Sequence, residues 1–240
     1  MITQRTAEWS RSPGDVPVAE RGVYVAVSGN TGAGKSSLIA AAVELGARRG
    51  LPIVGVSERT FHHPLLPLMF SDPGTYAFSV QLNFMLQRHM FLLRHLGLGH
   101  TIFMERSHLD DEMFVREHEL GGHIDQAQRA VYDALAAVLH AELPAPDALL
   151  LLDVSPETSI ERVKQSEDAG QRPREFPDEE SKRAWIHRWY RLYGALHAQL
   201  HRRADGDARL AGTRLLDRDA ATPTQILAAE VVDLVAALRR

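Results

Sequence analysis

The sequence predicts an α/β fold in which helices flank a five-stranded parallel sheet, and three observations support this prediction. Short apolar runs alternate along the chain with longer amphipathic stretches, which is the rhythm of parallel strands joined by helices. The short runs are apolar at almost every position, as expected of strands covered on both faces. The first run leads directly into a glycine-rich turn and then into a stretch that favours a helix.

Each element is assigned in chain order from its own pattern. The short apolar runs are assigned to strands at Val23–Ser28, Pro52–Ser57, Thr101–Met104, Ala148–Asp153 and Thr213–Asp217. The amphipathic stretches are assigned to helices at Lys35–Arg49, Thr75–Leu96, Ile124–Ala141, Glu157–Ser166, Asp178–Arg203 and Pro223–Leu238. One boundary has its own signal, because Ser155 suits a helix cap and Pro156 the first helical position.

The composition is that of a globular protein with one sizeable core. The chain has 240 residues, of which 45% are hydrophobic, and a formal net charge of -4, which disfavours nonspecific binding of nucleic acid. The absence of cysteine excludes disulfides, thiolate metal sites and cysteine nucleophiles. No apolar run approaches the roughly 18 residues of a membrane span. We therefore expect a cytoplasmic protein without membrane or nucleic-acid partners.

The chain is expected to form a single domain over residues 21–240. Residues 1–20 lack the apolar core of a signal peptide and are predicted to be a flexible tail. The segment Ser166–Ser181 is polar and contains a glycine and two prolines between two expected helices. It is predicted to be a surface loop that serves as a lid, at about residues 166–181.

The stretch GNTGAGKS, from Gly29 to Ser36, matches the phosphate-binding pattern G-x-x-x-x-G-K-S in full. Its glycines permit the turn that aims backbone N–H groups at an anion, and the following helix N-terminus adds partial positive charge. Lys35 is expected to reach the β- and γ-phosphates of ATP, and the Ser36 hydroxyl to bind Mg²⁺. An ordinary glycine-rich turn is the alternative. The predicted cradle consists of Gly29, Asn30, Thr31, Gly32, Ala33, Gly34, Lys35, Ser36 and Ser37.

The rest of the sequence narrows the classes of nucleotide-binding protein to which this chain could belong. It contains no Asn-Lys-x-Asp guanine-binding motif and no Asp-x-x-Gly after an apolar strand, which disfavours a GTPase switch. Motor and transporter ATPases usually need a longer chain and a coupling element. A small-molecule kinase needs a base for the acceptor hydroxyl, cations for the moving phosphoryl group and a lid that excludes water.

Two stretches place such groups at the expected ends of apolar strands. The second strand leads to Glu58, and the third to Glu105 and Arg106. Ligands of open α/β sheets gather at the carboxyl ends of strands, so Glu58 is a candidate base for an attacking hydroxyl. Glu105 is a candidate to hold a Mg²⁺-bound water, and Arg106 to steady the acceptor oxygen or the phosphoryl charge. A solvated loop glutamate and a structural ion pair are the alternatives.

A third stretch, QRPRE, lies inside the expected loop. Arg172 and Arg174 are candidates to close over the phosphates. Surface arginines in a charge-rich loop often have no specific role, which is the alternative here.

Taken together, these stretches resemble the deoxynucleoside kinase family, relatives of deoxyguanosine, deoxycytidine and mitochondrial thymidine kinases. The resemblance runs from about Tyr24 to the C-terminus and is carried by the cradle, by Glu58 and by the sequences FSDPGTYAFSVQLNFMLQR, MERS and DVSPETSIERV. It implies a P-loop kinase fold with a lid loop and a homodimer. It also implies ATP- and Mg²⁺-dependent phosphorylation of the 5′-hydroxyl of a nucleoside or deoxynucleoside. In that family, the residues matching Glu58, Glu105 and Arg106 are the catalytic base, the acid that helps to hold Mg²⁺ and the arginine that orients the base and the 5′-oxygen.

The resemblance also implies a set of residues that reads the nucleobase. Gln81 matches the family's base-reading glutamine, and Arg88 and Asp111 complete a set found in purine- and cytosine-preferring members. The polar stripe of an ordinary helix is the alternative for Gln81 and Arg88. Phe114 is expected to stack on the base, with a core phenylalanine as the alternative.

The sequence departs from the family pattern at several positions. Arg59 replaces the proline that normally follows the glutamate, and Phe70 stands where many members have a tyrosine that bonds the sugar 3′-hydroxyl. The segment that precedes Phe114 is one residue short, so Asp110 is an alternative to Asp111 as the base reader.

The lid departs as well. The family's lid arginines follow the ERV helix at once, whereas Arg172 and Arg174 come later, which implies a longer lid. Glu175 is a candidate for the family's sugar-binding lid glutamate.

Two other functions stay open from the residues themselves. Arg59 leaves room for a kinase of nucleoside monophosphates or of another small metabolite, and the cradle alone is compatible with an ATP-binding regulatory protein. The twelve histidines lack the helical pairing with glutamate that marks a zinc protease, so Mg²⁺ is the only metal expected.

Overall fold

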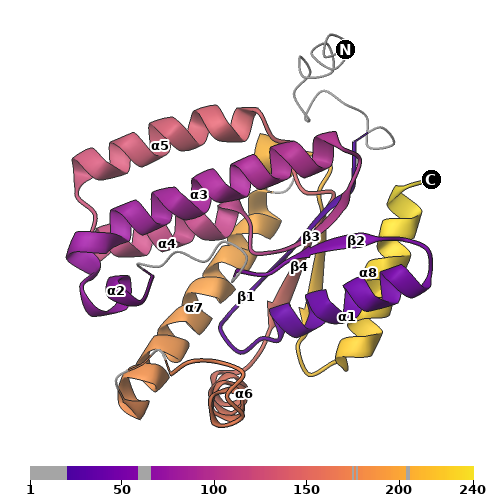
Figure 1. The fold of residues 1–240 in the computed structure, drawn as a ribbon. Helices are drawn as coiled ribbons and strands as arrows, with labels where there is room; N and C mark the ends of the chain where they lie inside the picture. Colours follow the sequence, from indigo (N-terminus) through magenta and orange to yellow (C-terminus); the bar gives the residue numbers. More distant parts are fainter. Residues whose placement is uncertain (1–20, 59–65, 175, 177, 204–205) are drawn as a thin grey trace, which may run out of the picture.

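The computed structural model describes residues 21–58, 66–174, 176, 178–203 and 206–240. At its centre is one sheet of parallel strands in the order β2-β3-β1-β4-β5 (Figure 1). β1 lies between β3 and β4, so the turn that follows it opens in the middle of the carboxyl edge of the sheet. The strands are β1 (Tyr24–Gly29), β2 (Ile53–Val56), β3 (Thr101–Glu105), β4 (Ala148–Asp153) and β5 (Arg214–Asp219).

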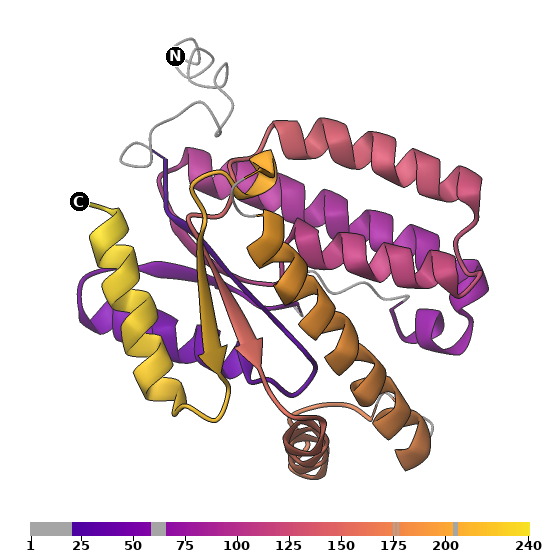
Figure 2. The same cartoon turned by 180° about the vertical axis from the view of Figure 1, so that it is seen from behind.

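Helices cover both faces of the sheet (Figures 1 and 2). One face carries α1 (Lys35–Arg48) and α8 (Thr224–Leu238). The other face carries α3 (Pro73–Gly97), α4 (His108–Leu120), α5 (Gln126–Ala141) and α7 (Glu179–Arg203). The remaining elements are α2 (Leu66–Ser71), α6 (Pro156–Asp168) and the short 3-10 helix η4 (Ala208–Leu210).

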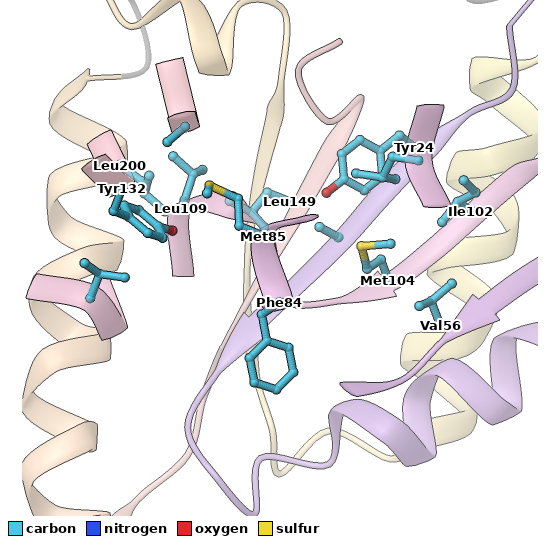
Figure 3. Packing of buried hydrophobic residues seen from close by; sticks show 14 of the residues in the cluster. Tyr24, Val56, Phe84, Met85, Ile102, Met104, Leu109, Tyr132, Leu149 and Leu200 are labelled. Carbon is cyan, nitrogen blue, oxygen red and sulfur yellow. The ribbon is translucent and has the colours of Figure 1, made fainter. Parts of the chain in front are cut away.

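The central strand divides its side chains between two hydrophobic clusters. Val25 and Val27 belong to the cluster against α1 and α8, whereas Tyr24 and Ala26 point to the opposite side. On that side Phe84 and other residues of α3 belong to the same cluster as the strand residues (Figure 3). All strand positions of β1 are buried, which explains why its sequence is a continuous apolar run.

The predicted fold class is confirmed, and each predicted strand and helix occurs with its ends within two residues of the predicted bounds. Among the described residues, the α-helices α2 and α4 and the 3-10 helix η4 were not predicted. The α4 stretch, HLDDEMFVREHEL, has no clear apolar period because Asp110 and Asp111 are themselves buried. A signal was present, since the Ser107 side chain and the Asp110 carboxylate cap the helix reciprocally.

The connection between α6 and α7 is shorter than the predicted lid at residues 166–181. α6 continues to Asp168 and α7 begins at Glu179, so only residues 169–178 lie between the two helices. Both helix ends are joined by Lys182, whose Nζ donates to Glu167 at 2.6 Å and to Glu179 at 2.8 Å. The predicted tail at residues 1–20 lies outside the described residues. In the part of the chain described, no helix has the length and apolar character to cross a membrane.

Candidate active site

The turn between β1 and α1 is shaped by glycine. Gly32 has a φ of 80°, and a Cβ there would lie 2.7 Å from the carbonyl oxygen of Ser159 in α6. Lys35, the first residue of α1, is buried, and its Nζ donates to the carbonyl oxygens of Gly29 (2.8 Å) and Asn30 (2.9 Å). A glycine-rich turn at a helix N-terminus already attracts anions, and the ammonium group adds a full positive charge.

Glu105, the last residue of β3, contacts this turn. Its Oε2 accepts a hydrogen bond from the Ser36 hydroxyl at 2.9 Å, and its Oε1 lies 3.6 Å from Lys35 Nζ. Burial lowers the pKa of Lys35 from 10.5 to about 8, while the nearby Glu105 carboxylate opposes this shift. The ammonium group is therefore held next to a carboxylate at a place where it lacks the stabilisation of water.

Ser36 and Glu105 together have the chemistry of a partial magnesium site. Carboxylate and hydroxyl oxygens suit Mg²⁺, which usually takes one or two protein ligands and completes its shell with phosphates and water. Among the residues that the structure describes, no group of three or more His, Cys, Asp or Glu side chains could hold a metal ion alone. A cation at Ser36 and Glu105 therefore depends on phosphate oxygens, and the donors fit Mg²⁺ that arrives with a nucleotide.

Glu58 and Arg106 form an ion pair across the carboxyl ends of β2 and β3. The backbone N–H of Glu58 also donates to Glu105 Oε2 at 3.2 Å. Arg106 has a φ of 64°, the one positive φ at a non-glycine residue in the described chain, and such strained conformations cluster at functional sites. The structure thus brings together the ends of the two strands at which the sequence placed its candidate catalytic residues.

Two cavities meet at this ion pair. The cradle cavity, of about 900 Å³, lies over the glycine-rich turn and includes Lys35, Ser36 and Glu105 in its lining. The small pocket has about 100 Å³. Four residues line both cavities: Thr31, Glu58, Arg106 and Arg172. A group bound in one cavity therefore lies next to a group bound in the other. The rest of the small pocket is lined by Leu66, Met69, Phe70, Gln81, Phe84, Asp111, Phe114, Phe176 and Trp185.

Two of the predicted base-reading residues, Gln81 and Asp111, line the small pocket, and the third, Arg88, is paired with Asp111. Arg88 and Asp111 form a buried two-bond ion pair, with Nε to Oδ2 at 2.9 Å and Nη2 to Oδ1 at 3.1 Å. Arg88 Nη1 also donates to the carbonyl oxygens of Glu105 and Arg106. Gln81 is buried in α3, with Nε2 at 3.9 Å from the sulfur of Met69. Since such a contact is weak, the amide of Gln81 retains most of its hydrogen-bonding capacity for a ligand.

The two candidate aspartates have different environments. Asp110 accepts hydrogen bonds from the Ser28 hydroxyl at 2.7 Å and from the Ser107 backbone N–H at 2.8 Å, so it caps α4 and joins it to β1. Asp111 pairs with Arg88 and lines the small pocket. The geometry therefore favours Asp111 over Asp110 as the residue that faces a ligand.

Aromatic side chains close one side of the small pocket. The ring of Phe114 lies 4.7 Å from the guanidinium carbon of Arg106 and 4.2 Å, between centroids, from Trp189. Phe70 contacts the edge of Trp185, with 5.7 Å between the ring centroids. The Phe70 position offers no hydroxyl, so a sugar oxygen there would need another partner.

The lid arginines are separated by the structure. Arg172 lines both cavities. Arg174 does not line the cradle cavity. Its guanidinium is largely exposed and lies 3.5 Å from Asp168, so the structure does not bring Arg174 to the cradle cavity together with Arg172. The sequence of a polar loop does not show in which direction each side chain points, which is why the two arginines were grouped. Glu175 and Arg59 lie outside the described residues.

Arg162 and Tyr193 are among the residues near the site that sequence reasoning missed. Arg162 of α6 lines the cradle cavity and donates to the carbonyl oxygen of Ala220 at 2.8 Å. Tyr193 of α7 is buried, and its hydroxyl accepts a hydrogen bond from Arg106 Nε at 3.1 Å. Arg162 was detectable from its place in the sequence ERV, which the resemblance had singled out. Tyr193 had no local signal, because its partner is distant in sequence.

Comparison with known proteins adds a family. Residues 25–174 match the family model described as deoxynucleoside kinase. A deoxyadenosine kinase from Dictyostelium discoideum is 30% identical over 156 residues, which cover 65% of this chain and 62% of the relative. A deoxyguanosine kinase from Lactobacillus acidophilus is 31% identical over 148 residues, which cover 58% of this chain and 61% of the relative. The chain thus spans less than two thirds of the length of either relative.

The fold is shared with a solved structure. The deoxyadenosine kinase from M. mycoides with bound dATP has a TM-score of 0.63 and 20% sequence identity, over 88% of this chain and 98% of that one. At this identity the likeness concerns the fold.

Proposed function

Because this chain belongs to the deoxynucleoside kinase family, we propose that it transfers the γ-phosphoryl group of ATP to the 5′-hydroxyl of a deoxynucleoside. One observation carries the proposal more than any other. Glu58 and Arg106 stand where the cradle cavity meets the small pocket, so a carboxylate and a guanidinium separate a phosphate site from a second ligand site.

In this proposal each residue near the Glu58–Arg106 ion pair has its own role in phosphoryl transfer. The Glu58 carboxylate accepts the proton of the attacking hydroxyl. Arg106 and Lys35 stabilise negative charge on the phosphoryl group. Ser36 and Glu105 would hold Mg²⁺, which supplies charge neutralisation between the β- and γ-phosphates when bound. Gly29 to Ser37 form the turn that holds the phosphates in this proposal; of these residues, Thr31 to Ser37 line the cradle cavity, and Arg172 lines it from the lid.

We propose a purine or cytosine deoxynucleoside as the acceptor. Gln81 and the Arg88–Asp111 pair supply an amide and a carboxylate fixed by a guanidinium, which suit the donor and acceptor edge of these bases. Two relatives bear the names of deoxyadenosine and deoxyguanosine kinase, which agrees with a purine. The small pocket of about 100 Å³ is below the roughly 300 Å³ or more of typical ligand cavities, so binding requires its walls to part. Phe114 and Phe70 are then the aromatic contacts of base and sugar.

A substrate panel tests this function. Deoxyadenosine, deoxyguanosine, deoxycytidine, thymidine and the matching monophosphates are each offered with ATP and Mg²⁺, and ADP formation is measured. We expect nucleoside-dependent ADP with a purine or cytosine nucleoside preferred over thymidine. Turnover only with monophosphates would favour the rival kinase class, and ATP binding without turnover on any acceptor would favour a regulatory protein.

We further propose that residues 21–240 act as one domain in a cytoplasmic homodimer. The dimer and the location rest on the resemblance to the family. Light scattering of the purified chain at micromolar concentration tests the dimer, with a mass of twice 26.7 kDa as the expected result.

A further inference from the structure

The backbone of Arg106 is held by hydrogen bonds at both its N–H and its carbonyl group. Its N–H donates to the carbonyl oxygen of Val27 at 2.8 Å, and its own carbonyl oxygen accepts from Arg88 Nη1 at 3.1 Å. These contacts hold the left-handed conformation at φ 64°. They fix where the side chain begins, but a side chain with several rotatable bonds needs further contacts to fix the guanidinium group.

The guanidinium group has two such contacts. Nη1 donates to Glu58, and Nε donates to the Tyr193 hydroxyl at 3.1 Å. The ring of Phe114 lies against the guanidinium carbon. Nη2 has no hydrogen bond to any residue in the part of the chain described, so it is the nitrogen left for a ligand. Because Glu58 and Tyr193 accept from two different nitrogens, they fix both the plane of the guanidinium group and its rotation within that plane.

A tyrosine hydroxyl is well suited to this task. Burial raises the pKa of Tyr193, so the hydroxyl stays neutral throughout the pH range in which an enzyme works. A neutral acceptor orients the arginine without a second negative charge that would compete with phosphate for it. Tyr193 lies on α7 with Trp185 and Trp189 at helical spacing, so its position is fixed by an aromatic stripe of the same helix.

We infer that Tyr193 is a positioning residue that holds the guanidinium group of Arg106 in its reactive orientation. The inference rests on the proposed function for its catalytic consequence. The contact itself is independent of that function, because it joins two side chains of this chain and can be measured without turnover.

The first test is kinetic and uses Tyr193→Phe, which removes the hydroxyl and keeps the ring. We expect kcat to fall about tenfold, the usual cost of one hydrogen bond to a charged group, with both KM values changed by less than about twofold. Tyr190→Phe, on the same helix and more than one-third exposed, is the matched control and should leave kcat unchanged. Equal kcat in the two variants would overturn the inference.

A double-mutant cycle separates positioning from general packing. In an Arg106→Lys background the Nε donor is absent, so adding Tyr193→Phe should have no further effect on kcat. If the two losses simply multiply, Tyr193 acts by another route and the inference is wrong.

A further test, by NMR spectroscopy, does not require turnover. The Arg106 Nε–H signal in a ¹H–¹⁵N spectrum, assigned by its loss in Arg106→Lys, should exchange slowly with water in the wild type and faster in Tyr193→Phe. Unchanged exchange would overturn the inference even if the protein phosphorylates nothing. Slow exchange lost in the variant, with no turnover in the wild type, would support the contact and reject the proposed function.

Discussion

The cradle cavity and the small pocket share an ion pair but are built in different ways. The floor of the cradle comes from one short stretch, in which glycine conformations, backbone groups and Lys35 form the site. The small pocket collects residues from α2, α3, α4, α7, the α6–α7 connection, two strand ends and, at Thr31, the β1–α1 turn. A phosphate needs charge and N–H donors, which one turn supplies, whereas a nucleoside must be recognised by shape and by specific donors.

This difference predicts where substitutions act. Changes at the junction should affect the chemical step, changes in the small pocket should affect fold stability and acceptor choice together, and changes at the cradle should affect nucleotide binding. The predictions below test that division, beginning with the largest expected effect.

Glu58→Gln tests the junction. It keeps the size of the side chain but removes the proposed proton acceptor, so kcat should fall by roughly 10²–10⁴. The affinity for ATP, measured by calorimetry, should remain within about twofold, because Glu58 is not part of the phosphate turn. Full activity of this variant would remove the role of Glu58 as the base, and a large loss of ATP affinity would show that the two cavities are not separable.

Asp111→Asn tests the small pocket. Arg88 is buried with Asp111 as its charged partner, so removal of that charge should lower the free energy of unfolding by roughly 3–5 kcal/mol, as measured by denaturant titration. Asp133→Asn is the control, since its side chain is about half exposed and its pair with Arg129 should be worth about 1 kcal/mol or less. Similar losses of unfolding free energy in both variants would mean that the buried pair stabilises the fold no more than the exposed pair does.

The same division explains what could be predicted from the sequence. The turn between β1 and α1 and the ends of the strands lie where the sequence placed them, since both follow from local patterns at fixed spacing. The buried acids of α4 obscured its helical period, because their partners, Ser28 and Arg88, lie far away in the sequence. For the same reason the choice between Asp110 and Asp111 stayed open until the fold placed one under β1 and the other beside Arg88.

Arg162 and Tyr193 show more clearly which contacts cannot be predicted from the sequence. Arg162 reaches the cradle cavity because α6 packs on the turn, where Ser159 leaves no room for a side chain at Gly32. Tyr193 meets Arg106 across a sequence separation of 87 residues. Such contacts depend on how helices are arranged around the sheet, which no spacing rule along the chain specifies.

The pH dependence of ATP binding tests the cradle. Only the protonated form of Lys35 attracts phosphate, and burial lowers its pKa to about 8 in the free protein. The charge is therefore lost as pH rises through 8, and bound phosphate opposes this loss. We expect the affinity for ATP to fall by about tenfold between pH 7 and pH 9.

Lys35→Arg provides the control for this titration. Arginine stays protonated throughout the range, so the affinity of the variant for ATP should be nearly constant with pH, whatever its absolute value. A parallel decline in both proteins would assign the pH effect to another group.

An effect of similar size concerns the lid, where two arginines two positions apart are compared. Arg172 lines both cavities, so Arg172→Ala should lower kcat/KM for ATP by about tenfold, as expected for a charged contact with phosphate. Arg174 is exposed beside Asp168, and Arg174→Ala should change the same parameter by less than about twofold. The reverse order would mean that the α6–α7 connection rearranges when ATP binds, so that Arg174 replaces Arg172 over the phosphates. In that case the residues that line the cradle cavity and the small pocket would differ between the protein with ATP and the protein without it.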